Sequence, residues 1–77
     1  MNMLSVRQIE AFRAVMLTRS MTRAAASLSI SQPAVSRLIA DLEYEIGFSL
    51  FRRRKGGLEP SADARALFAE GFLTIVG

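Results

Sequence analysis

The sequence predicts a mainly α-helical domain of the winged helix-turn-helix class: a three-helix core, a short β-hairpin wing and a further C-terminal helix. Two observations carry this prediction. A small-residue helical segment, Ala24 to Ala26, is followed after a short connection by Ser31, which can begin another helix. Farther along, two short apolar runs enclose a basic, glycine-containing segment at residues 52–57, as in a β-hairpin. A chain of 77 residues is long enough for one such domain and too short for two separate cores.

The first helix is expected to begin after Ser5 and to run to about Arg19. Ser5 and Gln8 have the spacing of a capping box, in which each side chain satisfies a backbone N–H of the other residue. Apolar residues then recur at helical spacing, which predicts the stripe of a core helix: Val6, Ile9, Phe12, Val15 and Met16.

The second helix is expected to end near Leu28. Ser20 and Thr22 are both candidates for its N-cap. Its interior alanines, Ala24 to Ala26, would allow another helix to approach closely.

Ser31 is the expected N-cap of the third helix, and Pro33 falls in its first turn, where a missing N–H costs little. Gly47 is expected to end this helix in a left-handed conformation. The helical period predicts a buried stripe of Val35, Leu38, Ile39, Leu42 and Ile46. The opposite side then carries Gln32, Pro33, Ser36, Arg37 and Ala40.

The wing is expected to pair strands at Phe48–Phe51 and Leu58–Pro60, with a basic tip at Arg52 to Lys55. Ser61 is expected to cap a fourth helix from Ala62 to about Val76. Its apolar band is wider than one small core can cover, which predicts packing against a second subunit or a further chain. The band consists of Leu67, Phe68, Phe72, Ile75 and Val76.

Positive charge is segregated along the chain. The net charge is +3, and residues 1–40 carry five arginines against the single acidic residue Glu10. An acidic block at residues 41–45 separates them from the basic run at residues 52–55. A fold that brings the two basic regions to one face would have the electrostatic footprint of a nucleic-acid-binding protein. From charge alone, a merely solvated basic surface remains the alternative.

Catalysis is not predicted, because the chain contains no histidine and no cysteine. The absence of cysteine also excludes disulfides and thiolate metal sites. Gly56 and Gly57 lack the spacing and lysine of a phosphate-binding loop, and the acidic residues at 41–45 lack the glycine turn of a cation loop. We therefore expect no metal and no cofactor in this domain. With no secretory signal pattern and no apolar run of membrane-spanning length, a soluble cytoplasmic protein is expected.

The start of the third helix carries the side chains that base recognition requires. Glutamine can pair bidentately with adenine, arginine with guanine or a phosphate, and a proline ring can contact a thymine methyl group. Gln32 and Ser36 are four residues apart and therefore share one face, with Arg37 adjacent. Each residue also has a simpler interpretation: Ser31 as a cap only, Ser36 as a solvated serine, and Arg37 as the partner of Asp41.

Taken together, these motifs resemble the N-terminal DNA-binding domain of LysR-type bacterial transcriptional regulators. The resemblance covers essentially the whole chain, from an opening helix at residues 7–12 to the wing. It rests on Ser20 to Ala25, Ser31 to Arg37, Leu42-Glu43, Gly47, Leu50-Phe51 and Arg53.

The resemblance implies a third helix in the major groove, a wing at a minor groove and a fourth helix that serves as a dimerising linker. It assigns base contacts to Gln32, Pro33, Ser36 and Arg37, and phosphate contacts to Thr22 and Ser31. The minor-groove role falls on Arg53, with Arg52, Arg54 and Lys55 competing for it. Dimerisation is expected through Leu67, Phe68, Phe72 and Ile75.

By the same resemblance, residues 1–60 form the DNA-binding domain and residues 61–77 begin the linker helix. The family's effector-binding domain, which follows the linker, is missing from this chain. Two departures stand out. Arg52 occupies a position that is usually acidic, and residues 60–64 replace the usual threonine and alanine-glycine pair. The wing and the opening helix look most like the branch that regulates amino-acid and opine metabolism.

The predicted function is sequence-specific binding of double-stranded DNA at an interrupted inverted repeat. The protein would act as a homodimer, or as a tetramer in its full-length form, without a membrane partner. Two alternatives stay open: a module that binds protein through its fourth helix, and an architectural protein without sequence preference. A salt-sensitive interaction with duplex DNA would argue against the first alternative, and a preferred sequence against the second.

Overall fold

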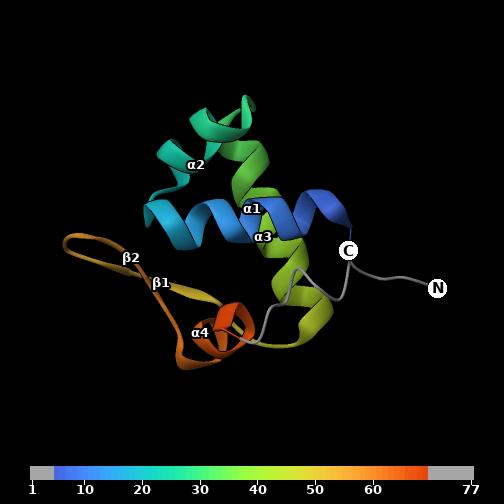
Figure 1. The fold of residues 1–77 in the computed structure, drawn as a ribbon, viewed down its shortest axis with the longest axis vertical. Helices are drawn as coiled ribbons and strands as arrows, with labels where there is room; N and C mark the ends of the chain where they lie inside the picture. Colours follow the sequence, from blue (N-terminus) through green and yellow to red (C-terminus); the bar gives the residue numbers. More distant parts are fainter. Residues whose placement is uncertain (1–4, 70–77) are drawn as a thin grey trace.

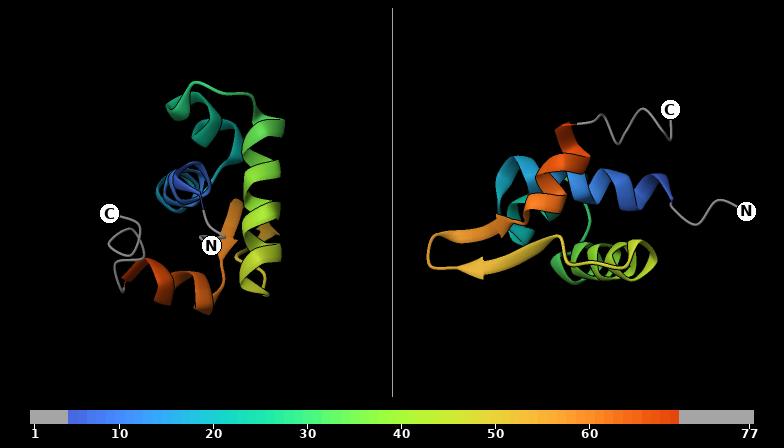
Figure 2. Two further views of the ribbon diagram at one scale, coloured as in Figure 1. Left: turned by 90° about the vertical axis from the view of Figure 1, so that its right-hand side faces the viewer. Right: turned by 90° about the horizontal axis from the view of Figure 1, so that it is seen from below.

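The computed structural model describes residues 5–69 of the chain. Three helices form the body, and a two-stranded hairpin extends from it to one side (Figure 1). The elements are α1 (Val6–Thr18), α2 (Met21–Leu28), α3 (Gln32–Ile46), β1 (Phe51–Arg54), β2 (Gly57–Pro60) and α4 (Ala62–Ala69). Helix α1 crosses α3, and α4 lies at the end of α3 from which the chain enters the hairpin (Figure 2). The predicted mainly helical, winged helix-turn-helix architecture is confirmed.

Serine side chains begin all four helices. The predicted capping box of α1 is present, with the Gln8 amide N–H donating to Ser5 Oγ at 3.1 Å and the Ser5 N–H donating to Gln8 Oε1 at 2.9 Å. Of the two candidate caps for α2, Ser20 accepts the hydrogen bond, from the N–H of residue 23 at 3.1 Å. Ser31 and Ser61 cap α3 and α4 in the same way, as predicted. Local sequence therefore determines where each helix starts.

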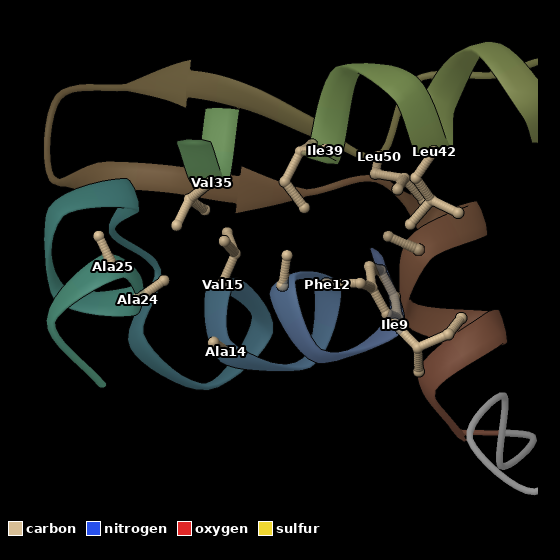
Figure 3. Packing of buried hydrophobic residues seen from close by; sticks show 12 residues of the cluster. Ile9, Phe12, Ala14, Val15, Ala24, Ala25, Val35, Ile39, Leu42 and Leu50 are labelled. Carbon is tan, nitrogen blue, oxygen red and sulfur yellow. The ribbon is translucent and has the colours of Figure 1, made fainter. Parts of the chain in front are cut away.

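Buried side chains from α1, α2 and α3 form one core (Figure 3). Phe12 lies at its centre with 1% of its surface exposed, and Val35, Ile39 and Leu42 of α3 are buried as predicted. Leu38 and Ile46 pack against the cluster but are only partly buried. Two expectations need correction. Val6 is 58% exposed because it stands on the first residue of α1, beyond the core cluster, and Ala26 faces solvent while Ala24 and Ala25 are buried.

The first strand lies three residues later than predicted. Residues 48–50 form a connection in which Leu50 is fully buried, its N–H donating to the Glu43 carboxylate at 2.7 Å and its carbonyl oxygen accepting from the Ser61 N–H at 2.8 Å. The ladder begins at Phe51, which pairs with Pro60, and ends where Arg54 pairs with Gly57. The arginines therefore lie on the strand rather than at the tip. The prediction failed because the exposed strand has no apolar alternation to reveal it.

A backbone hydrogen bond and a ring contact help to attach the hairpin to the body, and Leu58 of β2 also packs against the core. The Leu58 N–H donates to the Arg19 carbonyl oxygen at 3.1 Å, which joins β2 to the end of α1. The Phe51 ring packs against the Phe12 ring with their centroids 6.0 Å apart. Gly57 has a φ of +130°, and a Cβ atom there would lie 3.0 Å from the Arg19 oxygen. A glycine at this position thus permits both the backbone conformation and the close approach.

Part of the apolar band of helix α4 packs against the core of this chain. Ala64 is fully buried, Leu67 packs against the core, and the Phe68 ring meets the Phe12 ring at 6.2 Å in an edge arrangement. Phe68 still exposes 37% of its surface. Phe72, Ile75 and the rest of the predicted helix lie outside the described residues. The expectation of a second subunit on this band stays a prediction.

Candidate nucleic-acid interface

The N-terminal turn of α3 presents polar side chains on the side opposite the core. Val35 and Ile39 are buried, which fixes the rotation of the helix about its axis. Pro33 and Arg37 are consequently exposed, while Gln32 and Ser36 are partly exposed. Within this group the Gln32 Nε2 donates to Ser36 Oγ at 2.8 Å, so the two residues predicted to share a face are in direct contact.

Arg37 is a strongly exposed charge on this face of α3, with 80% of its side chain accessible. Its Nε lies 3.6 Å from the Asp41 carboxylate, one helical turn away. The simple interpretation of Arg37 as a partner of Asp41 is therefore correct in part. An exposed pair at this separation is weak, since both groups remain hydrated, and it leaves the guanidinium available to a stronger anion.

Three elements meet at a cleft of about 250 Å³. It brings together Thr22 from the first turn of α2, Gln32 from α3 and Arg53 from β1. The remaining lining residues are Arg19, Ser20, Met21, Arg54, Gly57 and Leu58. One candidate from each class inferred from the sequence, phosphate-binding, base-reading and wing, thus shares a single cleft. Ser31, Pro33, Ser36, Arg37, Arg52 and Lys55 do not line it.

Arg19 is the residue that sequence reasoning missed. It adopts a left-handed conformation with φ of 57° at the end of α1, and its Nε donates to the Met16 carbonyl oxygen at 3.2 Å. It enters the cleft because β2 docks on its carbonyl group, 39 positions farther along the chain at Leu58. No local sequence motif predicts a contact between residues so far apart in the chain. The clustering of arginines in the first half of the sequence was the available hint.

The strand register separates the arginines of the wing. Arg52 pairs with Glu59 and Arg53 with Leu58, so Arg52 and Arg54 share one face and Arg53 lies on the other. Arg54 Nε lies 2.6 Å from Glu59 Oε1. This hydrogen bond and the Arg54 charge lower the pKa of Glu59, with smaller contributions from Arg52 and Arg65. Both Arg53 and Arg54 line the cleft, but Arg54 is paired with Glu59, whereas Arg53 has no carboxylate partner among the described residues.

The family model of bacterial regulatory helix-turn-helix proteins of the lysR family matches residues 6–65. The chain belongs to this family. It is 59% identical over 68 residues to the regulatory protein NocR of Agrobacterium fabrum, covering 88% of this chain and 23% of NocR. It is also 46% identical over 74 residues to OccR of Rhizobium meliloti, the octopine catabolism/uptake operon regulatory protein, covering 96% of this chain and 25% of OccR. The chain thus spans about a quarter of the length of these regulators.

Among solved structures, the fold is similar to that of the CbnR DNA-binding domain in a complex with DNA. The TM-score is 0.84 at 30% identity, over 94% of this chain and 83% of that chain. The winged helix-turn-helix of the present LysR-family chain is therefore a DNA-binding domain fold. Between residues 5 and 69, no helix is long and apolar enough to cross a bilayer, and no three acidic, histidine or cysteine side chains gather as a metal site would require.

Proposed function

We propose that this chain is the sequence-specific, double-stranded DNA-binding part of a LysR-type transcriptional regulator and has no enzymatic activity of its own. The observation that carries the proposal is the shared cleft, in which Thr22, Gln32 and Arg53 meet from three separate elements. A phosphate-binding turn, a base-reading helix and a basic wing must lie side by side to follow a duplex across its grooves. Membership of the lysR family supports this proposal.

In this proposal α3 enters the major groove with its N-terminal turn. Gln32 and Arg37 pair with base edges, and the exposed Pro33 ring contacts apolar groups such as the thymine methyl. The Ser36 hydroxyl group lies on the same face, where it accepts a hydrogen bond from the Gln32 amide. The helix is held in this orientation by the burial of Val35 behind it. Specificity then resides in a single turn whose outer face is polar and whose inner face belongs to the core.

Phosphate contacts are proposed for Thr22 and Ser31, which stand at or near the N-termini of α2 and α3. Unpaired N–H groups and the positive end of the helix dipole favour an anion there. On the wing, Arg53 is proposed to enter the minor groove because it lacks the carboxylate partner that holds Arg54. Arg52, Arg54 and Lys55 then lie along the flanking phosphates.

The functional unit is proposed to be a homodimer on an interrupted inverted repeat, with half-sites about one helical turn apart. Dimerisation uses the apolar band of α4, through Leu67, Phe68, Phe72 and Ile75. In this organisation residues 1–60 bind DNA and residues 61–77 begin the linker to an effector-binding domain. The full-length protein would form dimers or tetramers in the cytoplasm, and its targets would be genes of opine or amino-acid metabolism, a proposal supported by the similarity to OccR, the octopine catabolism/uptake operon regulatory protein.

Titration of the 77-residue chain with duplex DNA at two salt concentrations tests the proposal. Binding should weaken steeply with salt, and selection from a random pool should yield one preferred sequence. Gln32→Ala or Arg37→Ala should then cost about 1–3 kcal/mol on that sequence and less on random DNA. Arg13→Ala is the matched control, because Arg13 is exposed in a separate groove between α1 and α2. Binding that does not respond to salt would favour a protein-binding module instead.

A further inference from the structure

Gln32 and Ser36 form a hydrogen-bonded pair on the exposed turn of α3. The Gln32 Nε2 donates to Ser36 Oγ at 2.8 Å, a short distance for a bond of this type. Ser36 stands directly after the fully buried Val35, so its position on the helix is fixed by the core. Gln32 is the first residue of the helix, where its long side chain would otherwise rotate freely.

We propose that Ser36 is a positioning residue for Gln32: its hydroxyl group restrains the Gln32 amide in the orientation that reads a base pair. This inference rests on the proposed DNA-binding function and assigns Ser36 a role that acts through its neighbour. The bidentate contact to adenine needs one amide N–H for N7 and the amide oxygen for the N6 amino group. Because an amide has two N–H groups, donation of one to Ser36 leaves both required atoms available.

The restraint matters because the terminal torsion of a glutamine side chain has a broad, shallow energy profile. An unrestrained amide presents its donor and acceptor in several arrangements, so it distinguishes poorly between base pairs. A restrained amide has already lost most of this freedom and gives up less entropy when it binds. Ser36 therefore affects which base pair is preferred, through Gln32, more than it affects overall affinity.

The test compares base preferences of Gln32→Ala, Ser36→Ala and the double variant, selected on duplexes randomised over two half-sites. Gln32→Ala should reduce discrimination at one base pair by about 5- to 150-fold. Ser36→Ala should reduce discrimination at that same base pair by about 2- to 10-fold. The double variant should resemble Gln32→Ala alone, since Ser36 has no amide left to restrain. Ser36→Thr, which retains a hydroxyl group, should keep the preference.

Ser27→Ala is the matched control, because Ser27 is an exposed helical serine in the groove between α1 and α2 and should leave every preference unchanged. The inference is overturned if Ser36→Ala alters a different base pair from Gln32→Ala, or if the effects of the two substitutions simply add. Either result would mean that Ser36 reads a base directly. A parent chain that selects no sequence at all would instead remove the proposed function, and this inference with it.

Discussion

Helix α3 presents one arginine to solvent and the β-hairpin presents three, but the two elements are held in place in different ways. Helix α3 buries Val35, Ile39 and Leu42 in the core and is capped at both ends by its own neighbours in the sequence. The hairpin consists of two four-residue strands, and it is held by a hydrogen bond to Arg19 and by packing of Phe51 and Leu58 against the core. An isolated two-stranded hairpin is at best marginally stable in water. The position of α3 is thus set locally and by the core, whereas the wing is set by contacts distant in sequence.

The largest loss of stability is expected at the residue that packs against both helix α3 and the hairpin. Phe12 is 1% exposed and contacts the Phe51 ring of β1 while lying in the same core as α3. Phe12→Ala should lower the free energy of unfolding by about 3–5 kcal/mol, because it removes a buried ring and leaves a cavity. Chemical denaturation measures this loss.

Phe68→Ala provides the control, since Phe68 touches the same ring but is 37% exposed. It should cost less than half as much. Equal losses in the two variants would mean that the hairpin and α3 do not depend on one central residue.

A substitution at Gly57 should weaken the wing without affecting α3. Gly57→Ala places a Cβ atom 3.0 Å from the Arg19 oxygen and forces an L-residue into a φ of +130°. The strain should destabilise the wing by roughly 1–3 kcal/mol while α3 stays intact. Hydrogen exchange should accelerate at the Leu58 N–H and remain unchanged at Val35.

Gly56→Ala is a matched neighbour, because a Cβ atom at that glycine would meet no other atom within 4 Å. It should leave exchange at Leu58 close to that of the parent chain. If both alanine variants accelerate exchange equally, the docking of β2 on Arg19 does not hold the wing.

The difference between local contacts and contacts distant in sequence explains which features could be predicted from the sequence. The caps at Ser5, Ser31 and Ser61 and the end of α3 at Gly47 were predicted correctly, because a cap depends on residues within one turn. The second strand was predicted to within one residue, but the first was misplaced because Leu50, expected on that strand, instead fills the core and bonds to Glu43. From a short apolar run alone, it is not possible to tell whether its residues form a strand or are buried in the core.

The candidate site follows the same pattern. The exposed face of α3 was predicted from helical periodicity, since burial of one side requires exposure of the other. The convergence of Thr22, Gln32 and Arg53 on one cleft was not predictable in detail, and Arg19 was not singled out at all. Both depend on where the hairpin docks, which is a contact between residues 19 and 58 with no signature in local spacing.

Within the wing, the register predicts unequal roles for neighbouring arginines. Arg53→Ala should reduce the slope of log binding constant against log salt concentration by about 1, because Arg53 lines the cleft and, in the proposed function, places its charge in the minor groove between the phosphates of the two strands. Arg52→Ala removes the same charge from the face that carries Glu59, and should change the slope less. Titrations with random-sequence duplex at several salt concentrations measure both slopes. Equal changes of slope in the two variants would show that an arginine's contribution to DNA binding does not depend on the face of the strand on which it lies.

The smallest effect concerns the ion pair that distinguishes Arg54 from Arg53. Arg54 lowers the pKa of Glu59 below its ordinary value of 4.5, so the folded chain binds this proton less readily than the unfolded chain does. The stabilisation by ionised Glu59 is therefore fully present above pH 4.5 and is lost as the pH falls through the lowered value. An NMR titration of the Glu59 carboxyl group should show the lowered pKa, and Arg54→Gln should return this pKa towards 4.5. Because the pair is exposed, salt at about 1 M should shift the pKa in the same direction. A pKa that Arg54→Gln leaves in place would mean that Arg54 is as free to bind DNA as Arg53.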